Sequence, residues 1–193
     1  MFAPLRGAPS TLIAFAMALT MAFGPALAGD PPSAIVSSLN QQALPLVNAK
    51  TPNSARLEEV IDAHADIDAV LKRALKQQWR TLSEPQLKEL KAQTLTLVGK
   101  AYASAMQDVD SKDITYQARS HKKKSARVGT TLAKDANAIR VDFRLRRRDT
   151  GWKVVDVIIS GVSIVAVYSA DFEAVLTHKG VDGLIAALRE RNS

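Results

Sequence analysis

The sequence predicts an α+β domain in which helices cover one face of an antiparallel four-stranded sheet. Two observations predict this class. Four short runs between residues 113 and 159 predict strands, and in the first and third of them apolar and polar residues alternate with the period of two that is typical of half-buried strands. Before and after this region, apolar residues instead recur every three or four positions, as in amphipathic helices. Four consecutive strands favour a meander, which would bury one face against the helices.

The first 28 residues have the three parts of a secretory signal peptide. Arg6 provides a positive charge, an apolar run follows from Leu12 to Phe23, and Ala26-Leu27-Ala28 forms a small-residue cleavage site. The apolar run is too short to remain as a membrane anchor. We therefore expect a signal peptide at residues 1–28 and a single soluble domain at residues 29–193, a length that suits one sizeable core.

The first half of the mature chain is expected to be helical. Residues 33–43 predict a weak helix that ends near Pro45, because proline removes a backbone donor. Residues 50–53 predict a connector. Helical spacing of the apolar residues in segments 57–64 and 67–79 then predicts two further helices.

The next helix has the clearest start in the sequence. Ser83 and Gln86 form a capping box, and Pro85 lies in the first helical turn. The helix is expected to bury an apolar stripe formed by Leu87, Leu90, Leu95, Val98 and Tyr102.

These runs place the strands at residues 114–118, 126–132, 139–147 and 152–159, of which the last is a mostly apolar run. The third run is the most regular, because every second residue from Ile139 to Leu145 is apolar and the residues between them are charged. Asp149, Thr150 and Gly151 separate the third run from the fourth and predict the turn of a hairpin.

Two helices are expected after the sheet. Helical spacing begins at Ile164, and Lys179 with Gly180 predicts the end of the first helix. Asp182 is the expected N-cap of a short final helix. The apolar stripe of that helix consists of Leu184, Ile185 and Leu188.

The chain is basic, with a formal net charge of +7, and much of the positive charge is local. One cluster spans residues 122–124, and a second consists of Arg144, Arg146, Arg147 and Arg148. A surface of this sign favours anionic partners such as lipid head groups, an acidic protein or nucleic acid, and export argues against nucleic acid. The alternative is a solvated outer sheet face whose arginines keep the sheet edges soluble.

Enzymatic and metal-binding functions find little support in the sequence. Gly161-Val162-Ser163 lies at a strand-to-helix change like a hydrolase nucleophile elbow, but Val165 stands where the second glycine belongs. Asp62, His64 and Asp66 match no ligand spacing, and His64 lies on an apolar helix face that predicts a packed residue. There is no cysteine and no phosphate-binding glycine-rich loop. We therefore expect no catalytic residue, no metal and no cofactor.

Asp156 is an acidic residue inside an apolar strand, Val154 to Ile159. If its side chain faces the helices, it is a buried carboxylate and needs a partner. Arg140 and Arg144 on the neighbouring strand are the candidates, and we expect a structural ion pair. If the side chain faces outward, it is an ordinary surface acid.

Several segments of the chain resemble the MlaC family, also called toluene-tolerance proteins. The most specific are GWKVVDVIISGVS, at residues 151–163, and the helix around Tyr168 and Phe172. ADIDAVLKRALKQQWRTLSEPQ, at residues 65–86, and KAYASAM, at residues 100–106, are also similar to family segments. Together the similarity spans about residues 65 to 192.

The resemblance implies a periplasmic phospholipid carrier. Its cavity would lie between the helices and the sheet, hold the acyl chains and leave the head group at the mouth. The candidate lining residues are Leu71, Leu75, Val98, Tyr102, Val141, Phe143, Leu145, Val155, Val157, Ile159, Ile164, Val165, Tyr168 and Phe172. Each of them could equally be ordinary core, since a close-packed interior uses the same residue types.

The resemblance also implies partners. The family shuttles lipid between an outer-membrane lipoprotein complex and an inner-membrane ABC transporter that bears an MCE-domain subunit. The segment from Arg144 to Arg148 is the candidate docking or head-group surface. Two alternatives stay open. Ala166 and Val167 resemble the hopanoid-associated HpnM branch, which favours a polycyclic lipid, and an interior filled with side chains would make the protein a non-lipid periplasmic adaptor.

Overall fold

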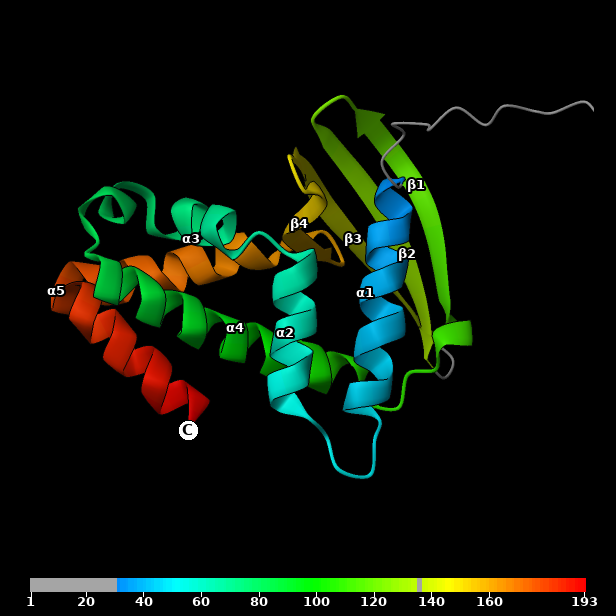
Figure 1. Cartoon of the computed structure of the whole chain (residues 1–193), viewed down its shortest axis with the longest axis horizontal. Coiled ribbons are helices and arrows are strands. Elements are labelled where there is room, and N and C mark those ends of the chain that lie inside the picture. The colour runs from blue at the N-terminus through cyan, green and yellow to red at the C-terminus, as the bar shows by residue number, and fades with distance from the viewer. Residues whose placement is uncertain (1–30, 135–136) are drawn as a thin grey trace, which may run out of the picture.

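The computed structural model describes residues 31–134 and 137–193, so the expected signal peptide lies outside the described residues. Helices come first in the chain, the strands of a single sheet follow, and one more helix ends the described part, as expected for an α+β fold (Figure 1). The helices of this described part are α1 Pro32–Val47, α2 Ser54–His64, α3 Ile67–Leu75, α4 Glu84–Met106 and α5 Ile164–Asn192, with short 3-10 helices η1 Lys76–Thr81 and η2 Ser111–Asp113.

The sheet is an antiparallel meander in the order β1-β2-β3-β4-β5. Its strands are β1 Ile114–Lys122, β2 Ser125–Lys134, β3 Asn137–Arg148, β4 Gly151–Ile159 and β5 Val162–Ser163. The four predicted strands are confirmed in position and order. The fifth strand was not predicted, because two residues are too few to show an alternating pattern.

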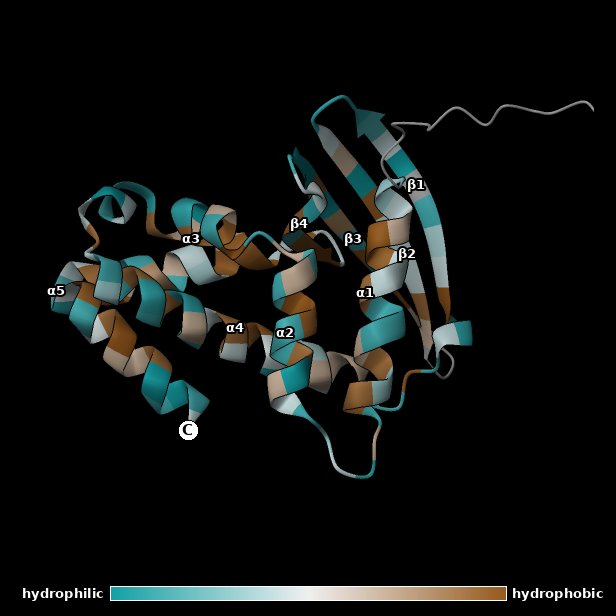
Figure 2. Ribbon diagram, in the orientation of Figure 1, coloured by the Kyte–Doolittle hydropathy of each residue, from teal (hydrophilic) through white to brown (hydrophobic). Residues whose placement is uncertain are grey.

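The helices form two groups around the sheet. Figure 1 shows α1 lying along the sheet, with α2 beside it, whereas α3, α4 and α5 extend away from the sheet as a helical layer. Figure 2 shows apolar and polar residues interspersed along α1 and α2, and the buried ones, among them Val36, Leu39, Val60 and Ile61, are apolar residues at helical spacing. This arrangement follows from the helical spacing of the apolar residues.

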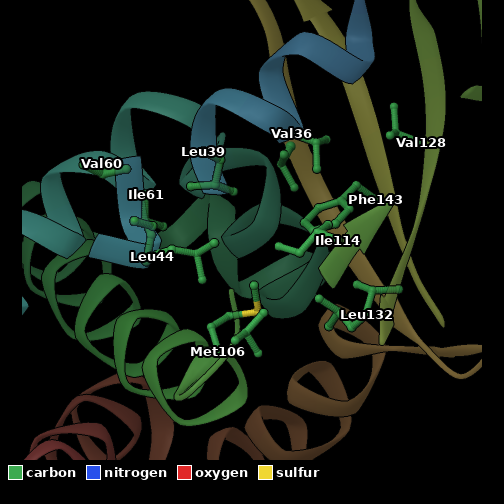
Figure 3. Packing of buried hydrophobic residues seen from close by; sticks show 14 of the residues in the cluster. Val36, Leu39, Leu44, Val60, Ile61, Met106, Ile114, Val128, Leu132 and Phe143 are labelled. Atoms are coloured by element: carbon green, nitrogen blue, oxygen red, sulfur yellow. The ribbon is translucent and has the colours of Figure 1, made fainter. Parts of the chain in front are cut away.

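Two apolar clusters hold these groups together. The first joins α1 and α2 to the sheet, and Figure 3 shows Val36 of α1 near Phe143 of β3. The second packs α3, α4 and α5 against one another, with Leu71 and Leu90 completely buried. The space where these clusters meet is the site described below.

At three helix boundaries, the observed end of the helix can be compared with the end predicted from the sequence. The first helix continues through Pro45 to Val47, because Pro45 is exposed and the carbonyl that loses its partner can face solvent. The expected helix at 67–79 instead ends at Leu75 and continues as a 3-10 helix, because Lys76 has a φ of 52°. The stop predicted at Gly180 is confirmed by its φ of 64°, which breaks α5 into two segments.

Candidate functional site

An apolar cavity lies between strands β3 and β4 and the helices. It has two lobes, with volumes of about 120 and 190 Å³. The lobes share six lining residues and are therefore adjoining parts of one cavity. The shared residues are Val98, Tyr102, Phe143, Val157, Ile164 and Tyr168.

The two lobes extend in different directions. The first lobe reaches between α2, α3 and α4, where Ile61, Leu71 and Leu97 line it. The second lobe reaches toward the β2–β3 end of the sheet, where it is lined by Leu132 and by the exposed residue Ala105 of α4. Because it is partly lined by an exposed residue, the second lobe meets the protein surface along α4.

Helical spacing brings the lining residues of α4 and α5 to the cavity. Val98 and Tyr102 are four residues apart on α4, and Tyr168 and Phe172 are four residues apart on α5, so each pair shares one helix face. The Tyr168 and Phe172 rings stack with their centroids 6.0 Å apart. Ser163 begins α5 by accepting a hydrogen bond from the Ala166 backbone at 3.1 Å, which fixes where the helix meets the cavity.

A β-bulge decides which residues of β4 face the cavity. Phe143 pairs with Val157, but the register shifts one step later, so that Leu145 pairs with Val154. Val155 is the extra residue of this bulge and has no partner across the strand pair. As a result, Val154 takes the inward position that strict alternation assigned to Val155.

Most of the expected lining residues are brought together. The residues that line one or both lobes are Leu71, Val98, Tyr102, Val141, Phe143, Val157, Ile159, Ile164, Val165, Tyr168 and Phe172. Three others are placed elsewhere, which corrects the expectation. Leu75 is buried within the second apolar cluster, Leu145 is buried within the first, and Val155 is displaced by the bulge.

Apart from Leu71, the lining residues of α1 and of the wall formed by α2 and α3 (the α2–α3 wall) were not predicted from the sequence. These include Leu39, Ile61, Ala65, Ile67 and Val70. Their helical periodicity was visible, but periodicity identifies a buried face without indicating what that face packs against. Ala65 is joined to β4 by an isolated parallel bridge to Val154, in which the Asp66 N–H donates to the Val154 carbonyl at 2.9 Å.

A chain of polar groups closes one side of the second lobe. The Tyr102 hydroxyl donates to Asn40 Oδ1 at 3.0 Å, and Asn40 Nδ2 donates to the Tyr116 hydroxyl at 3.0 Å. Burial, with a smaller contribution from Tyr116, raises the pKa of Tyr102 well above its usual range. Tyr102 therefore remains a neutral donor, and these polar groups meet the cavity with their hydrogen bonds satisfied.

Asp156 forms an ionic cluster beside the first lobe, and its side chain is fully buried. Arg73 of α3 and Arg144 of β3 contact its Oδ2 at 2.9 and 3.2 Å. The Ser163 hydroxyl donates to the same oxygen at 2.8 Å, and the Val165 N–H donates to Oδ1 at 3.3 Å. Of the two candidate partners, Arg144 forms the predicted ion pair, whereas Arg140 contacts Asp142 instead, and Arg73 is a partner that the sequence did not reveal. The cluster joins the sheet to two helices that line the cavity.

Comparison with known proteins gives a family and a fold. The MlaC protein family model matches residues 33–190. The chain belongs to the MlaC family. A solved structure of a phospholipid-binding protein from Ralstonia solanacearum, in complex with a phospholipid, superposes with a TM-score of 0.72. It is 22% identical in sequence, and the match covers 84% of this chain and 97% of that chain. A search of curated proteins finds no match.

The basic segment of this MlaC protein does not form one uniform surface. Arg144 is held by Asp156, and Arg148 Nε contacts Asp66 at 2.6 Å. Arg147 lies over the Trp152 ring, 5.6 Å from its centroid. Arg146 is exposed and has no ion-pair partner among the described residues.

Ser163 and His64, the candidates for catalysis or metal binding, have structural roles in this MlaC protein. The Ser163 hydroxyl is bonded to Asp156 and caps α5. His64 is buried, with Nδ1 2.8 Å from the Val60 carbonyl and Nε2 3.1 Å from the Ser38 hydroxyl, as expected for a packed residue. Within residues 31–134 and 137–193, no group of histidine and acidic side chains is arranged to hold a metal ion. None of the helices in these ranges is long and apolar enough to span a membrane.

Proposed function

We propose that this MlaC family protein is a soluble periplasmic carrier that holds the acyl chains of a phospholipid in the two-lobed cavity. The observation that supports this best is the cavity itself, whose shared lining comes from apolar residues of two helices and two strands. Burying a CH₂ group contributes about 0.8 kcal/mol, so exposing one long acyl chain to water costs on the order of 10 kcal/mol. A carrier needs apolar surface of this kind, and no catalytic group is required.

The size of the cavity suggests that binding widens it. The lobes, at about 120 and 190 Å³, lie together near the lower end of the range of about 300–1,000 Å³ for small-molecule sites. We propose that the α2–α3 wall moves outward when lipid enters. Among the described residues its backbone hydrogen bond to β4 is the one from Asp66 to Val154, and its other connections to the sheet include the side-chain ion pairs Arg73–Asp156 and Arg148–Asp66, so this movement needs fewer backbone bonds to break than the separation of two strands would.

The proposed lipid would travel between two membrane systems. We propose that the segment 1–28 directs export to the periplasm. The proposed partners are an outer-membrane lipoprotein complex and an inner-membrane ABC transporter with an MCE-domain subunit. These assignments rest on membership of the family, and the protein would act as the soluble substrate-binding component.

The proposed docking surface is the basic tip, which we define as residues 122–124 with Arg146 and Arg147. The Arg147 N–H donates to the Lys124 carbonyl at 3.1 Å, so the two hairpins meet there. The second lobe lies toward the opposite end of β2 and β3, where Leu132 pairs with Ile139. A head group at that opening would be remote from the basic tip, and this favours protein docking over head-group contact.

Lipid extraction tests the proposal. The full chain is expressed in a bacterium with its signal segment, and the purified protein is extracted with organic solvent for mass spectrometry. We expect stoichiometric phospholipid in the wild type and at least a tenfold loss in Val157→Trp, because the indole would fill both lobes. Val155→Trp is the matched control, since Val155 lies on the same strand but does not line the cavity.

The possible results separate the functions. A hopanoid in place of phospholipid would assign the protein to the polycyclic-lipid branch. A folded wild type without any lipid would contradict the carrier function and favour the adaptor. Equal lipid loss in both tryptophan variants would show that strand distortion, not cavity filling, removes the lipid.

A further inference from the structure

The second lobe meets the surface along α4, and two basic residues lie beside this opening. Among the residues that line the lobe, Ala101 and Ala105 of α4 are exposed and Tyr168 of α5 is half-buried. Lys100 precedes Ala101 in α4, and the Arg191 guanidinium lies over the Tyr168 ring, 5.7 Å from its centroid. Each of these two helices therefore carries a cation next to a residue that lines the lobe.

The C-terminal turn of α5 holds the two cations at the same edge of the opening. Lys100 Nζ donates to the carbonyl of Asn192, which is the residue after Arg191. Asn192 Nδ2 donates to the Gln93 carbonyl at 2.8 Å and so fixes this turn to α4. Figure 1 shows the C-terminal part of α5 running beside α4.

The charges of Lys100 and Arg191 are not compensated within the fold. Neither side chain forms an ion pair with a carboxylate among the residues that the structure describes. Arg189, on the same turn of α5, provides the contrast, because its Nε lies 2.7 Å from Glu89 Oε1. Both Lys100 and Arg191 are exposed, so an anion can approach them from solvent.

Structural roles use only part of what these side chains offer. Lys100 caps the C-terminus of α5, and Arg191 packs on an aromatic ring. An ammonium group has three donors and a guanidinium group has five. Lys100 uses one donor in its bond to Asn192, and the Arg191 contact is made by the face of its guanidinium plane. The remaining N–H groups are available for an oxyanion, and the two residue types are common phosphate ligands.

We propose that Lys100 and Arg191 bind the phosphate of the lipid head group where the second lobe opens. The inference rests on the proposed carrier function and adds the head-group site to it. A phosphate would lose its hydration inside an apolar lobe, so a lipid whose chains fill the lobe leaves its phosphate at the opening. The basic tip lies toward the other end of β2 and β3, so head-group binding and protein docking would use separate surfaces.

A competition between two lipids that differ only in the head group tests this site. Lipid-free mature protein binds a fluorescent diacylglycerol, which is then displaced by dioctanoyl phosphatidylglycerol or by dioctanoylglycerol. The variant combines Lys100→Gln with Arg191→Gln. The control combines Lys88→Gln with Arg80→Gln, which removes the same charge at exposed positions that line neither lobe. Lys88 is about three turns, or about 18 Å along the helix axis, from Lys100 on α4.

We expect wild type to bind the phosphatidylglycerol about tenfold more tightly than dioctanoylglycerol in dilute buffer, since two charge-assisted contacts are made in a partly screened position. In the variant that lacks both cations, this preference falls below about twofold, and the affinity for dioctanoylglycerol is unchanged. The control keeps the full preference. Salt at about 0.5 M reduces the preference of wild type, because exposed charges are screened.

The proposal is overturned if wild type binds the two lipids equally, or if the control loses as much of the preference as the variant, which would assign the effect to net charge. Urea unfolding verifies that both proteins are folded. Arg191→Gln alone keeps the Lys100 cap of α5, and we expect it to retain about a threefold preference. An undiminished preference in this single variant would remove Arg191 from the site.

Inorganic phosphate distinguishes a lipid phosphate from a free anion. It is titrated into lipid-free protein and followed by phosphorus NMR, and we expect no binding in the millimolar range. Binding that disappears when both cations are replaced would assign the site to free phosphate and overturn the assignment to a lipid. Failure of wild type to bind either lipid would instead refute the carrier function itself, so the two failures are distinguishable.

Discussion

Two buried acidic residues, Asp142 and Asp156, lie on neighbouring strands and are both surrounded by arginines, yet they connect different parts of the molecule. Asp142 contacts Arg119, Arg127 and Arg140, all of which belong to strands β1, β2 and β3. Asp156 contacts Arg144 of β3, but also Arg73 of α3 and the first turn of α5. The first cluster therefore stabilises the sheet alone, whereas the second holds the helical walls of the cavity to the sheet.

The comparison also explains the use of the basic residues. Many arginines on the strands face these two carboxylates, so their charge is partly compensated within the fold. On the sheet, the positive charge that is left for partners is concentrated at the basic tip, in residues 122–124 and Arg146, which are exposed. A count of charged residues along the sequence does not distinguish arginines that contact buried carboxylates from basic residues that stay free for partners.

Removing Asp156 should have the largest effect. Asp156→Ala leaves Arg73 and Arg144 without their shared acid and removes the bond to the Val165 N–H. We expect a loss of about 3 kcal/mol in the free energy of unfolding, at the lower end for a broken buried pair because both arginines are half-exposed. Urea denaturation measures it, with the exposed Asp171→Asn as control. A loss of less than about 1 kcal/mol would show that the cluster does not anchor the helices.

Asp142 should make the free energy of unfolding depend on pH. Burial alone would raise its pKa, but the Arg140 hydrogen bond and the charges of Arg127, Arg140 and Arg119 outweigh burial and lower the pKa. A carboxylate with a lowered folded pKa stabilises the protein fully above its unfolded value of about 3.9, and this stabilisation is lost as the pH falls through the folded pKa.

We therefore expect the free energy of unfolding of wild type to decrease from about pH 5 downward, and Asp142→Asn to show a shallower decrease. Urea denaturation at several values between pH 3 and pH 6 provides the comparison. Identical slopes for the two proteins would mean that Asp142 does not have a lowered pKa in the folded state. Because Asp142 contacts only strands, lipid content should be unchanged in this variant at neutral pH.

Substituting single arginines should have the smallest effects on stability. Comparing one arginine from each cluster tests whether the Asp156 cluster contributes more than the Asp142 cluster. Arg73→Gln removes the contact that joins α3 to β4, and we expect it to cost about 1 kcal/mol. Arg140→Gln leaves Arg119 and Arg127 on Asp142, so we expect a cost below about 0.5 kcal/mol. Thermal and urea unfolding of the two variants would test the order, and a larger cost for Arg140→Gln would reverse our assignment.

Local sequence patterns predicted the secondary structure well. The capping box of Ser83 and Gln86 is present with both of its bonds, and α4 begins at Glu84 as the motif requires. The four predicted strands correspond to β1 to β4 in the expected meander. These features depend on residues within a few positions of one another, which is why periodicity and capping rules identify them.

The cavity was harder to predict, because it depends on contacts between distant residues. Phe143 and Leu145 are both apolar and inward-facing on β3, but only Phe143 lines the lobes. Which of them borders empty space depends on the helix that lies opposite. The bulge at Val155 likewise depends on the pairing of β3 with β4, and Arg73 is 83 residues away from Asp156.

The meander connectivity of the sheet has a consequence for the order in which the protein folds. Apart from the isolated bridge of Val154 to Ala65, the pairing of β1 to β4 is between strands that are neighbours in the chain, so every hairpin can close over a short loop. The contacts of α3 with α5 join segments about 95 residues apart. Closing so long a loop costs more chain entropy before these contacts can form and stabilise the fold. We expect the sheet to assemble first and the helical wall to close onto it late, so that the cavity forms in the last step of folding.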